Sequence, residues 1–155
     1  MISPELLRRY PFFVDFTPDH LNTLAMLAEE QTYVKDEVIL RAGLPADTLY
    51  FLIEGGVDLH YEVIDELNPE LRKDFFISEM NPGEPFGISA LLEPYRYGGT
   101  VYANNPSRVL KFDAGGVRAL CELDSKICSI MMRRIAQAMM SRLRDTRVQL
   151  AAARV

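Results

Sequence analysis

One short stretch of the chain, PGEPFGISALLEPYRYGGTVYA at 82–103, combines glycines with a helix start and an arginine. The helix start is expected at residues 87–90, and Arg96 comes shortly before the pair Gly98–Gly99. Free backbone N–H groups at a helix start attract an anion, and an arginine pairs well with a phosphate or carboxylate. The stretch therefore predicts a pocket for an anionic ligand.

Other kinds of chemistry lack the residues that they need. His20 and His60 are isolated in the sequence, so the clustered histidines and carboxylate of a metal-dependent enzyme are missing. No Gly-x-Ser-x-Gly nucleophile elbow and no Walker phosphate loop occurs. We therefore expect no catalytic residue, no bound metal and no enzyme activity.

The composition is that of an ordinary globular domain. The chain has 155 residues, of which 48% are hydrophobic and 25% charged. No apolar run approaches the roughly 20 residues of a membrane helix. The first residues also lack the charged and then apolar layout of a signal peptide. We expect a cytoplasmic protein that does not associate with membranes.

Charge is distributed unevenly along the chain. Residues 126–155 carry a net charge of +6, whereas the whole chain carries −5, so the remainder carries −11. This asymmetry suggests contact between copies of the chain or with an anionic partner. The alternative is a solvated helix face whose arginine stems cover apolar surface.

Helices are expected first, followed by a block of strands. Ser3-Pro4 and Thr17-Pro18 have the residue types of helix starts, and apolar residues follow at helical spacing as far as Ala28. From about 32 to 112, short apolar runs alternate with turns, which indicates a sandwich or small barrel. The expected strands are 38–40, 49–53, 57–63, 75–80, 100–103 and 108–112, with a hairpin through Glu54-Gly55-Gly56.

A long helix is expected at about 125–153, where neither glycine nor proline occurs. Its apolar residues recur every three or four positions, which is typical of a coiled-coil seam. The predicted dimer residues are Ile127, Met131, Ile135, Met139, Leu143 and Leu150. We therefore expect a homodimer through this helix, with a helix folded back on its own sandwich as the alternative.

Taken together, these segments resemble the cyclic-nucleotide-binding domain family, and especially the sensor half of CRP/FNR-type catabolite activator regulators. The most specific pieces are GLPADTLYFLI at 43–53 with GGV at 55–57, and PGEPFG at 82–87. The resemblance implies a mostly β fold with flanking helices, a double-stranded β-helix jelly roll. It divides the chain into an N-terminal helical segment (1–31), the jelly roll (32–115) and C-terminal helices that include the dimer helix (116–155).

The resemblance also implies a pattern of polar groups for the site. In the family, the short helix after Phe-Gly faces the cyclic phosphate, a glutamate directly after it accepts the ribose hydroxyl, and an arginine pairs with the phosphate. In this sequence Ile88 takes the place of the glutamate and Tyr97 takes that of the arginine. Arg96 lies one position early, and one position on extended backbone turns a side chain to the opposite side.

We therefore expect a non-catalytic sensor or regulatory domain that does not bind cAMP or cGMP in the usual way. A small anionic or nucleotide-like ligand is one alternative, and a pocket filled by Ile88 and Tyr97 is the other. The candidate pocket residues are Phe86, Gly87, Ile88, Ser89, Ala90, Arg96, Tyr97, Gly98, Gly99 and Thr100.

The resembled regulators continue from the long helix into a helix-turn-helix domain. The sequence has no further segment in which to place a recognition helix, so we expect no DNA binding from these residues alone. The second interpretation is the effector-binding part of a CRP/FNR-type transcription regulator whose DNA-binding domain is absent from this chain. A protein partner is a further candidate.

Overall fold

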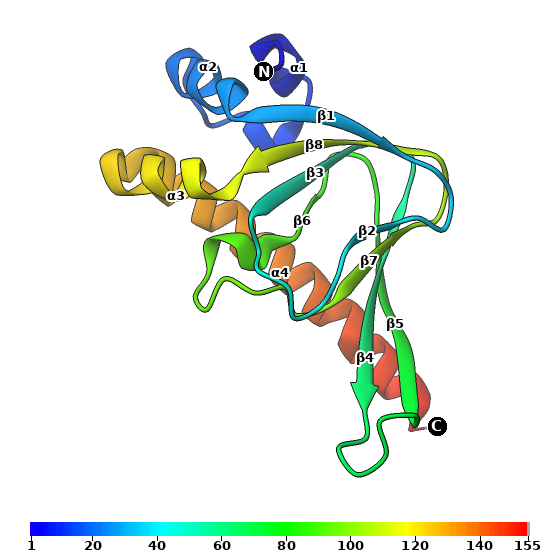
Figure 1. The fold of residues 1–155 in the computed structure, drawn as a ribbon. Helices are drawn as coiled ribbons and strands as arrows, with labels where there is room; N and C mark the ends of the chain where they lie inside the picture. Colours follow the sequence, from blue (N-terminus) through cyan, green and yellow to red (C-terminus); the bar gives the residue numbers. More distant parts are fainter. Residues whose placement is uncertain (155) are drawn as a thin grey trace.

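In the computed structural model, which describes residues 1–154, two four-stranded antiparallel sheets face each other (Figure 1). One sheet has the strand order β1-β8-β3-β6 and the other β2-β7-β4-β5. The strands are β1 (Ala28–Tyr33), β2 (Val38–Leu40), β3 (Thr48–Glu54), β4 (Val57–Ile64), β5 (Arg72–Met80), β6 (Pro85–Phe86), β7 (Thr100–Ala103) and β8 (Ser107–Asp113). The predicted jelly roll with flanking helices is confirmed.

Helices flank the sheets at both ends of the chain, and side-chain caps begin several of them. The helices are α1 (Pro4–Arg8), η1 (Pro11–Phe13), α2 (Pro18–Met26), η2 (Ile88–Leu91), α3 (Ala114–Leu123) and α4 (Ser125–Ala153). The Thr17 hydroxyl accepts from the His20 N–H at 3.2 Å, and the Asp124 carboxylate accepts from the Lys126 N–H at 3.0 Å. The bounds predicted for the long helix are confirmed.

The first strand begins earlier than predicted. Ala28, assigned to the end of a helix from its spacing, is the first residue of β1 and pairs with Phe112 of β8. A buried alanine fits the inner face of a helix as well as that of a strand. The spacing of Ala28 alone therefore does not distinguish the end of a helix from the start of a strand.

The predicted hairpin through Gly55-Gly56 is wrong, because β3 and β4 belong to different sheets. Gly55 has φ +91, and a Cβ there would lie 2.4 Å from the Ser107 Oγ. That hydroxyl donates to the Gly56 carbonyl at 3.1 Å. The glycines therefore form a corner, pinned by Ser107, that carries the chain from one sheet to the other.

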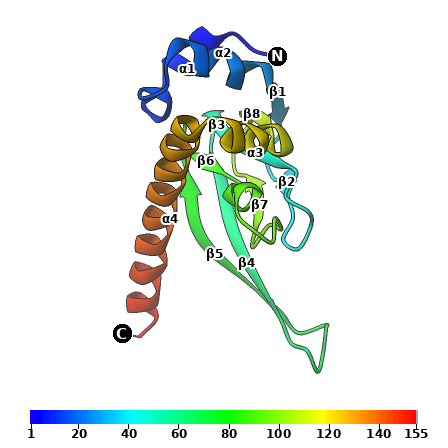
Figure 2. The ribbon, with the colours of Figure 1, turned by 90° about the vertical axis from the view of Figure 1, so that its left-hand side faces the viewer.

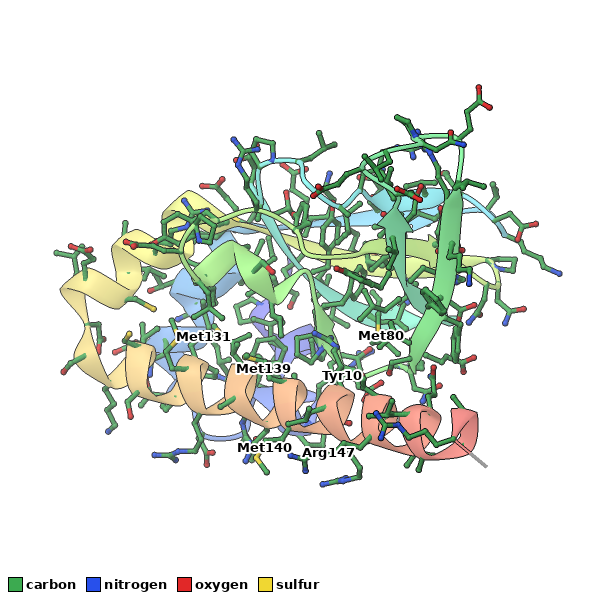
Figure 3. All side chains as sticks on the ribbon, turned by 90° about the horizontal axis from the view of Figure 1, so that it is seen from below. Tyr10, Met80, Met131, Met139, Met140 and Arg147 are labelled. Atoms are coloured by element: carbon green, nitrogen blue, oxygen red, sulfur yellow. The ribbon has the colours of Figure 1, made fainter. Side chains whose placement is uncertain are left out.

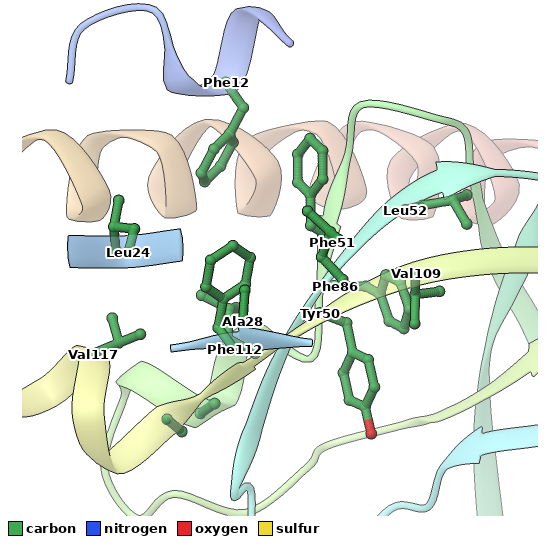
Figure 4. Packing of buried hydrophobic residues seen from close by; sticks show 14 of the residues in the cluster. Phe12, Leu24, Ala28, Tyr50, Phe51, Leu52, Phe86, Val109, Phe112 and Val117 are labelled. Carbon is green, nitrogen blue, oxygen red and sulfur yellow. The ribbon is translucent and has the colours of Figure 1, made fainter. Parts of the chain in front are cut away.

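Phe51 of β3 joins the N-terminal segment to the sandwich. Its ring centroid lies 5.1 Å from that of Tyr10, 5.4 Å from Phe12 and 5.0 Å from Phe13. Figure 4 shows Phe12 pointing from η1 toward the core and Phe51 nearby, with helix α4 passing them. The core is therefore shared by both sheets, η1 and α4.

Half of the predicted dimer seam lies in the core of the same chain. Ile127, Met131 and Ile135 are only 3%, 2% and 1% exposed, so they are not available to a partner and this part of the prediction is wrong. Met139, Leu143 and Leu150 are 47%, 49% and 53% exposed. Because a helix turns once every 3.6 residues, a stripe drawn every four residues drifts by about 40° per step around the helix.

Beyond Ile135, α4 runs beside β5 and the long β4–β5 hairpin projects past the sandwich (Figure 2). The Ser78 hydroxyl of β5 donates to the Asp145 carboxylate at 2.7 Å, and the Gln149 side chain donates to the Ile77 carbonyl. Polar contacts with one strand therefore hold the second half of α4 against the sheet.

We expect Phe51→Ala to lower the free energy of unfolding by about 3–5 kcal/mol, because it leaves a cavity beneath three aromatic rings. Chemical denaturation measures this change. Phe75→Ala, at a phenylalanine that is 46% exposed, is the matched control and should cost far less. Equal losses for the two variants would contradict the role given to Phe51.

Candidate functional site

A cavity of about 180 Å³ opens between η2, the loop that precedes β7 and the inner faces of β2, β4 and β5. Its lining consists of Leu40, Leu59, Met80, Phe86, Gly87, Ile88, Ser89, Tyr97, Gly98, Gly99, Val101 and Arg142. Most of the predicted pocket residues are therefore brought together, whereas Ala90, Arg96 and Thr100 lie outside the lining. We call this space the η2 cavity.

The predicted short helix is present as η2, and its start is fixed by close packing. Gly87 precedes η2 with φ +67, and a Cβ there would lie 3.0 Å from the Tyr50 ring. That ring stacks on Phe86, with centroids 4.9 Å apart and planes inclined by 10°. Ala90 is fully buried on the far side of η2, which is why it does not reach the cavity.

Arg96 and Tyr97 point in opposite directions, as the one-position difference predicted. Arg96 is exposed and donates through Nη1 to the Gly43 carbonyl at 2.9 Å. The Tyr97 hydroxyl donates to the Thr48 carbonyl at 2.6 Å and accepts from the Thr48 N–H at 3.2 Å. Burial raises the pKa of Tyr97 to about 12, so its hydroxyl stays protonated at neutral pH. The residue that the resemblance places where the phosphate-binding arginine is expected is thus neutral and already hydrogen-bonded.

Few polar side chains remain for a ligand in the predicted part of the lining. Ile88 is half-buried there and offers no acceptor, while Ser89 contributes a hydroxyl. The Thr100 hydroxyl accepts from the Ala42 N–H at 3.1 Å and is therefore engaged elsewhere. The Glu84 carboxylate accepts from the Asn81 N–H at 2.6 Å, so it stabilises the turn before β6 and does not replace the missing glutamate.

Two arginines from the C-terminal helices complete the site, and sequence reasoning missed the role of both. Arg118 of α3 donates to the Ala90 carbonyl at 2.8 Å and to the Ala46 carbonyl at 2.9 Å. Its guanidinium also lies 4.0 Å above the centre of the Tyr95 ring. Arg118 therefore holds η2 and the segment before β3 together, through backbone partners that no local sequence pattern reveals.

Arg142 of α4 is the second, and it reaches the η2 cavity itself. Its guanidinium is half-buried and donates to the Pro85 carbonyl. It also lines a neighbouring cavity of about 230 Å³ between α4, η1 and the turn before β6. Burial lowers the pKa of Arg142, while the carboxylates of Glu84 and Asp145 raise it. The sequence showed Arg142 only as one of several basic residues on a helix whose orientation was unknown.

Among residues 1–154, no three His, Cys, Asp or Glu side chains lie together in a group that could hold a metal ion. No helix in the same part of the chain is long and apolar enough to cross a membrane.

Known proteins share both the fold and the sequence pattern. Residues 30–124, more than half of the chain, match the model of the cyclic nucleotide-binding domain family. The structure of a protein from Geobacter metallireducens, named as a cyclic nucleotide-binding protein, is 33% identical. It superposes with a TM-score of 0.79, covering 92% of this chain and 99% of that one. The sensor domain of the transcriptional regulator DNR from Pseudomonas aeruginosa is 18% identical and shares the fold, with a TM-score of 0.69 over 87% of this chain and 91% of that domain.

A curated relative from Rhodopseudomonas palustris, named as a potassium channel protein, is 28% identical over 127 residues. The match covers 82% of this chain and 29% of that protein. The chain spans less than a third of the length of the curated relatives that it matches. With the jelly roll, the short helix after Phe86-Gly87 and the match over residues 30–124, the chain belongs to the cyclic nucleotide-binding domain family.

Proposed function

We propose that this chain is a non-catalytic regulatory domain that does not bind cAMP or cGMP in the usual way. One observation carries the proposal: Tyr97 stands where the resemblance places the phosphate-binding arginine, with its hydroxyl committed to Thr48. Ile88 at the ribose position supports it, because a hydrocarbon side chain cannot accept the hydroxyl proton.

The binding free energy lost with the missing polar groups is large enough to decide the affinity for a cyclic nucleotide. A ribose hydroxyl facing Ile88 would lose its partner, at a cost of about 1–3 kcal/mol, and a hydrogen bond to a charged group contributes about 1.5–3 kcal/mol. Together these losses correspond to roughly two to four decades in the dissociation constant. The η2 cavity, at about 180 Å³, is also smaller than most ligand pockets, which span roughly 300–1,000 Å³.

We also propose that the domain forms a homodimer through the outward face of α4. The apolar residues of this face are Ala136, Met139, Leu143 and Leu150, with the half-buried Met132 at its edge. They are three, four or seven residues apart, as in a coiled-coil seam. Met140 and Arg147 lie on the side of α4 that faces away from the sheets (Figure 3). Met139, Leu143 and Leu150 from the predicted seam are retained, whereas Met132 and Ala136 are added in place of the three buried residues.

A second candidate function is the effector-binding part of a CRP/FNR-type transcription regulator. The shared fold with the sensor domain of DNR favours this candidate. In that case the protein would be cytoplasmic, and DNA binding would require residues outside 1–155. A gel-shift assay tests this point. Specific binding of one DNA sequence by residues 1–155 would show that DNA binding needs no residues outside this range.

Titration calorimetry with cAMP and cGMP tests the proposed lack of ordinary nucleotide binding. We expect no dissociation constant in the micromolar range for either nucleotide. Ile88→Glu restores the missing acceptor and should tighten cAMP binding about tenfold or more relative to the unmodified chain. Micromolar binding of cAMP by the unmodified chain would overturn the proposal.

Leu143→Glu tests the proposed dimer face, because it places a charge in the centre of the seam. We expect the dimer dissociation constant, measured by analytical ultracentrifugation, to rise by roughly thirtyfold or more. Val148→Glu is the matched control: Val148 is 64% exposed on the same helix but lies off the stripe. A monomeric unmodified chain, or equal effects of the two substitutions, would exclude this interface.

A further inference from the structure

Arg142 makes no close ion pair in the described chain, although Glu84 and Asp145 lie near enough to oppose the lowering of its pKa by burial. It is half-buried between α4 and β6, and its guanidinium makes one hydrogen bond, to the Pro85 carbonyl. No ion pair joins it to a carboxylate within residues 1–154. A guanidinium has five N–H donors, and a buried charge without a paired counter-charge is unfavourable. The free donors of Arg142 are therefore available to an anion.

The space in front of Arg142 is mostly apolar. The side chains that surround the η2 cavity are those of Leu40, Leu59, Met80, Phe86, Ile88, Tyr97 and Val101, besides Ser89 and Arg142. The hydroxyl of Tyr97 is engaged with Thr48, so this residue presents only its ring. An apolar cavity of roughly 150 Å³ is known to hold benzene, and the η2 cavity is slightly larger at about 180 Å³. It therefore matches a ligand with a compact apolar body.

We propose that the η2 cavity binds a small organic monoanion, with its apolar body between Leu59 and Ile88 and its carboxylate on Arg142. The inference rests on the proposed regulatory function and names the ligand class of its site. Arg142 then takes the anion-pairing role that Tyr97 cannot fill, but from α4 and not from the loop before β7. The Ser89 hydroxyl, which also lines the cavity, is placed to donate a second hydrogen bond to the carboxylate.

Benzoate and hexanoate are suitable probes, because each combines a carboxylate with a small apolar body. In ¹⁵N-resolved NMR titrations we expect both to bind with dissociation constants of about 1 mM or tighter. The shifts should centre on the amides of Ser89, Gly98 and Gly99. Acetate and inorganic phosphate lack the apolar body, and benzyl alcohol lacks the charge, so each should bind at least about tenfold more weakly.

Arg142→Met tests the anion partner, with Arg144→Met as the matched control at an exposed arginine of the same helix. We expect the first substitution to weaken benzoate binding about tenfold or more and the second to leave it unchanged. Benzyl alcohol should bind both variants alike. This contrast separates an anion-binding role from a purely structural bond between Arg142 and Pro85.

Leu59→Trp provides a second test that keeps Arg142 intact. Leu59 is half-buried, so a larger ring can enter the cavity from β4 and should abolish benzoate binding. The chain contains no other tryptophan, so the fluorescence of the new side chain reports whether it is buried.

Failure of benzoate and hexanoate to bind at 10 mM (about tenfold above the expected constants), or binding that Arg142→Met leaves unchanged, would overturn the inference. The proposed regulatory function would survive that result if cAMP and cGMP also fail to bind and Leu143→Glu still disrupts a dimer. Micromolar cAMP binding would instead remove the proposed function itself.

Discussion

Burial of the first half of α4 against the sandwich is the interaction on which the rest of the site depends. Ile127, Met131 and Ile135 are almost completely buried in the core shared by both sheets. A rigid helix anchored at one end has its direction and its rotation fixed over its whole length. The same contacts therefore place Arg142 at the cavity wall and turn Met139 and Leu143 outward.

The loop around η2 is held in place from several directions at once. Tyr97 is hydrogen-bonded to the backbone of Thr48, and Arg118 is hydrogen-bonded to the Ala90 carbonyl within η2 and to the Ala46 carbonyl just before β3. Because these hydrogen bonds are made within the protein itself, little conformational entropy remains to be lost on binding. The short helix after Phe86-Gly87 is thus held in place, although Ile88 and Tyr97 stand where the family resemblance implies polar partners for a ligand.

The position of Arg142 connects the cavity with the proposed dimer face. A ligand that pairs with Arg142 would interact with α4 directly, and the proposed seam lies about a quarter turn around the same helix. A ligand shifts an equilibrium only through contacts that differ between the two states. A ligand carboxylate on the free donors of Arg142 would be such a contact.

Several properties of this chain could be predicted from local sequence. The extent of α4 follows from the absence of glycine and proline between 125 and 153, and the short helix follows from the residues around Gly87. The substitutions Ile88 and Tyr97 at the ribose and phosphate positions are visible in the sequence once the family resemblance is recognised. These features depend on neighbouring residues, whose preferences act over a few positions.

The tertiary structure decided which residues complete the site. Arg142 and Pro85 are 57 positions apart, and Arg118 and Ala46 are 72 apart, so no local pattern links them. The apolar residues of α4 were recognised as a set, but the drift of a four-residue stripe left their division between core and surface undetermined. Gly55-Gly56 likewise predicted a turn, whereas its direction into the other sheet depended on the approach of Ser107. Periodicity marks the apolar residues of a helix, but only packing decides which of them are buried and against what.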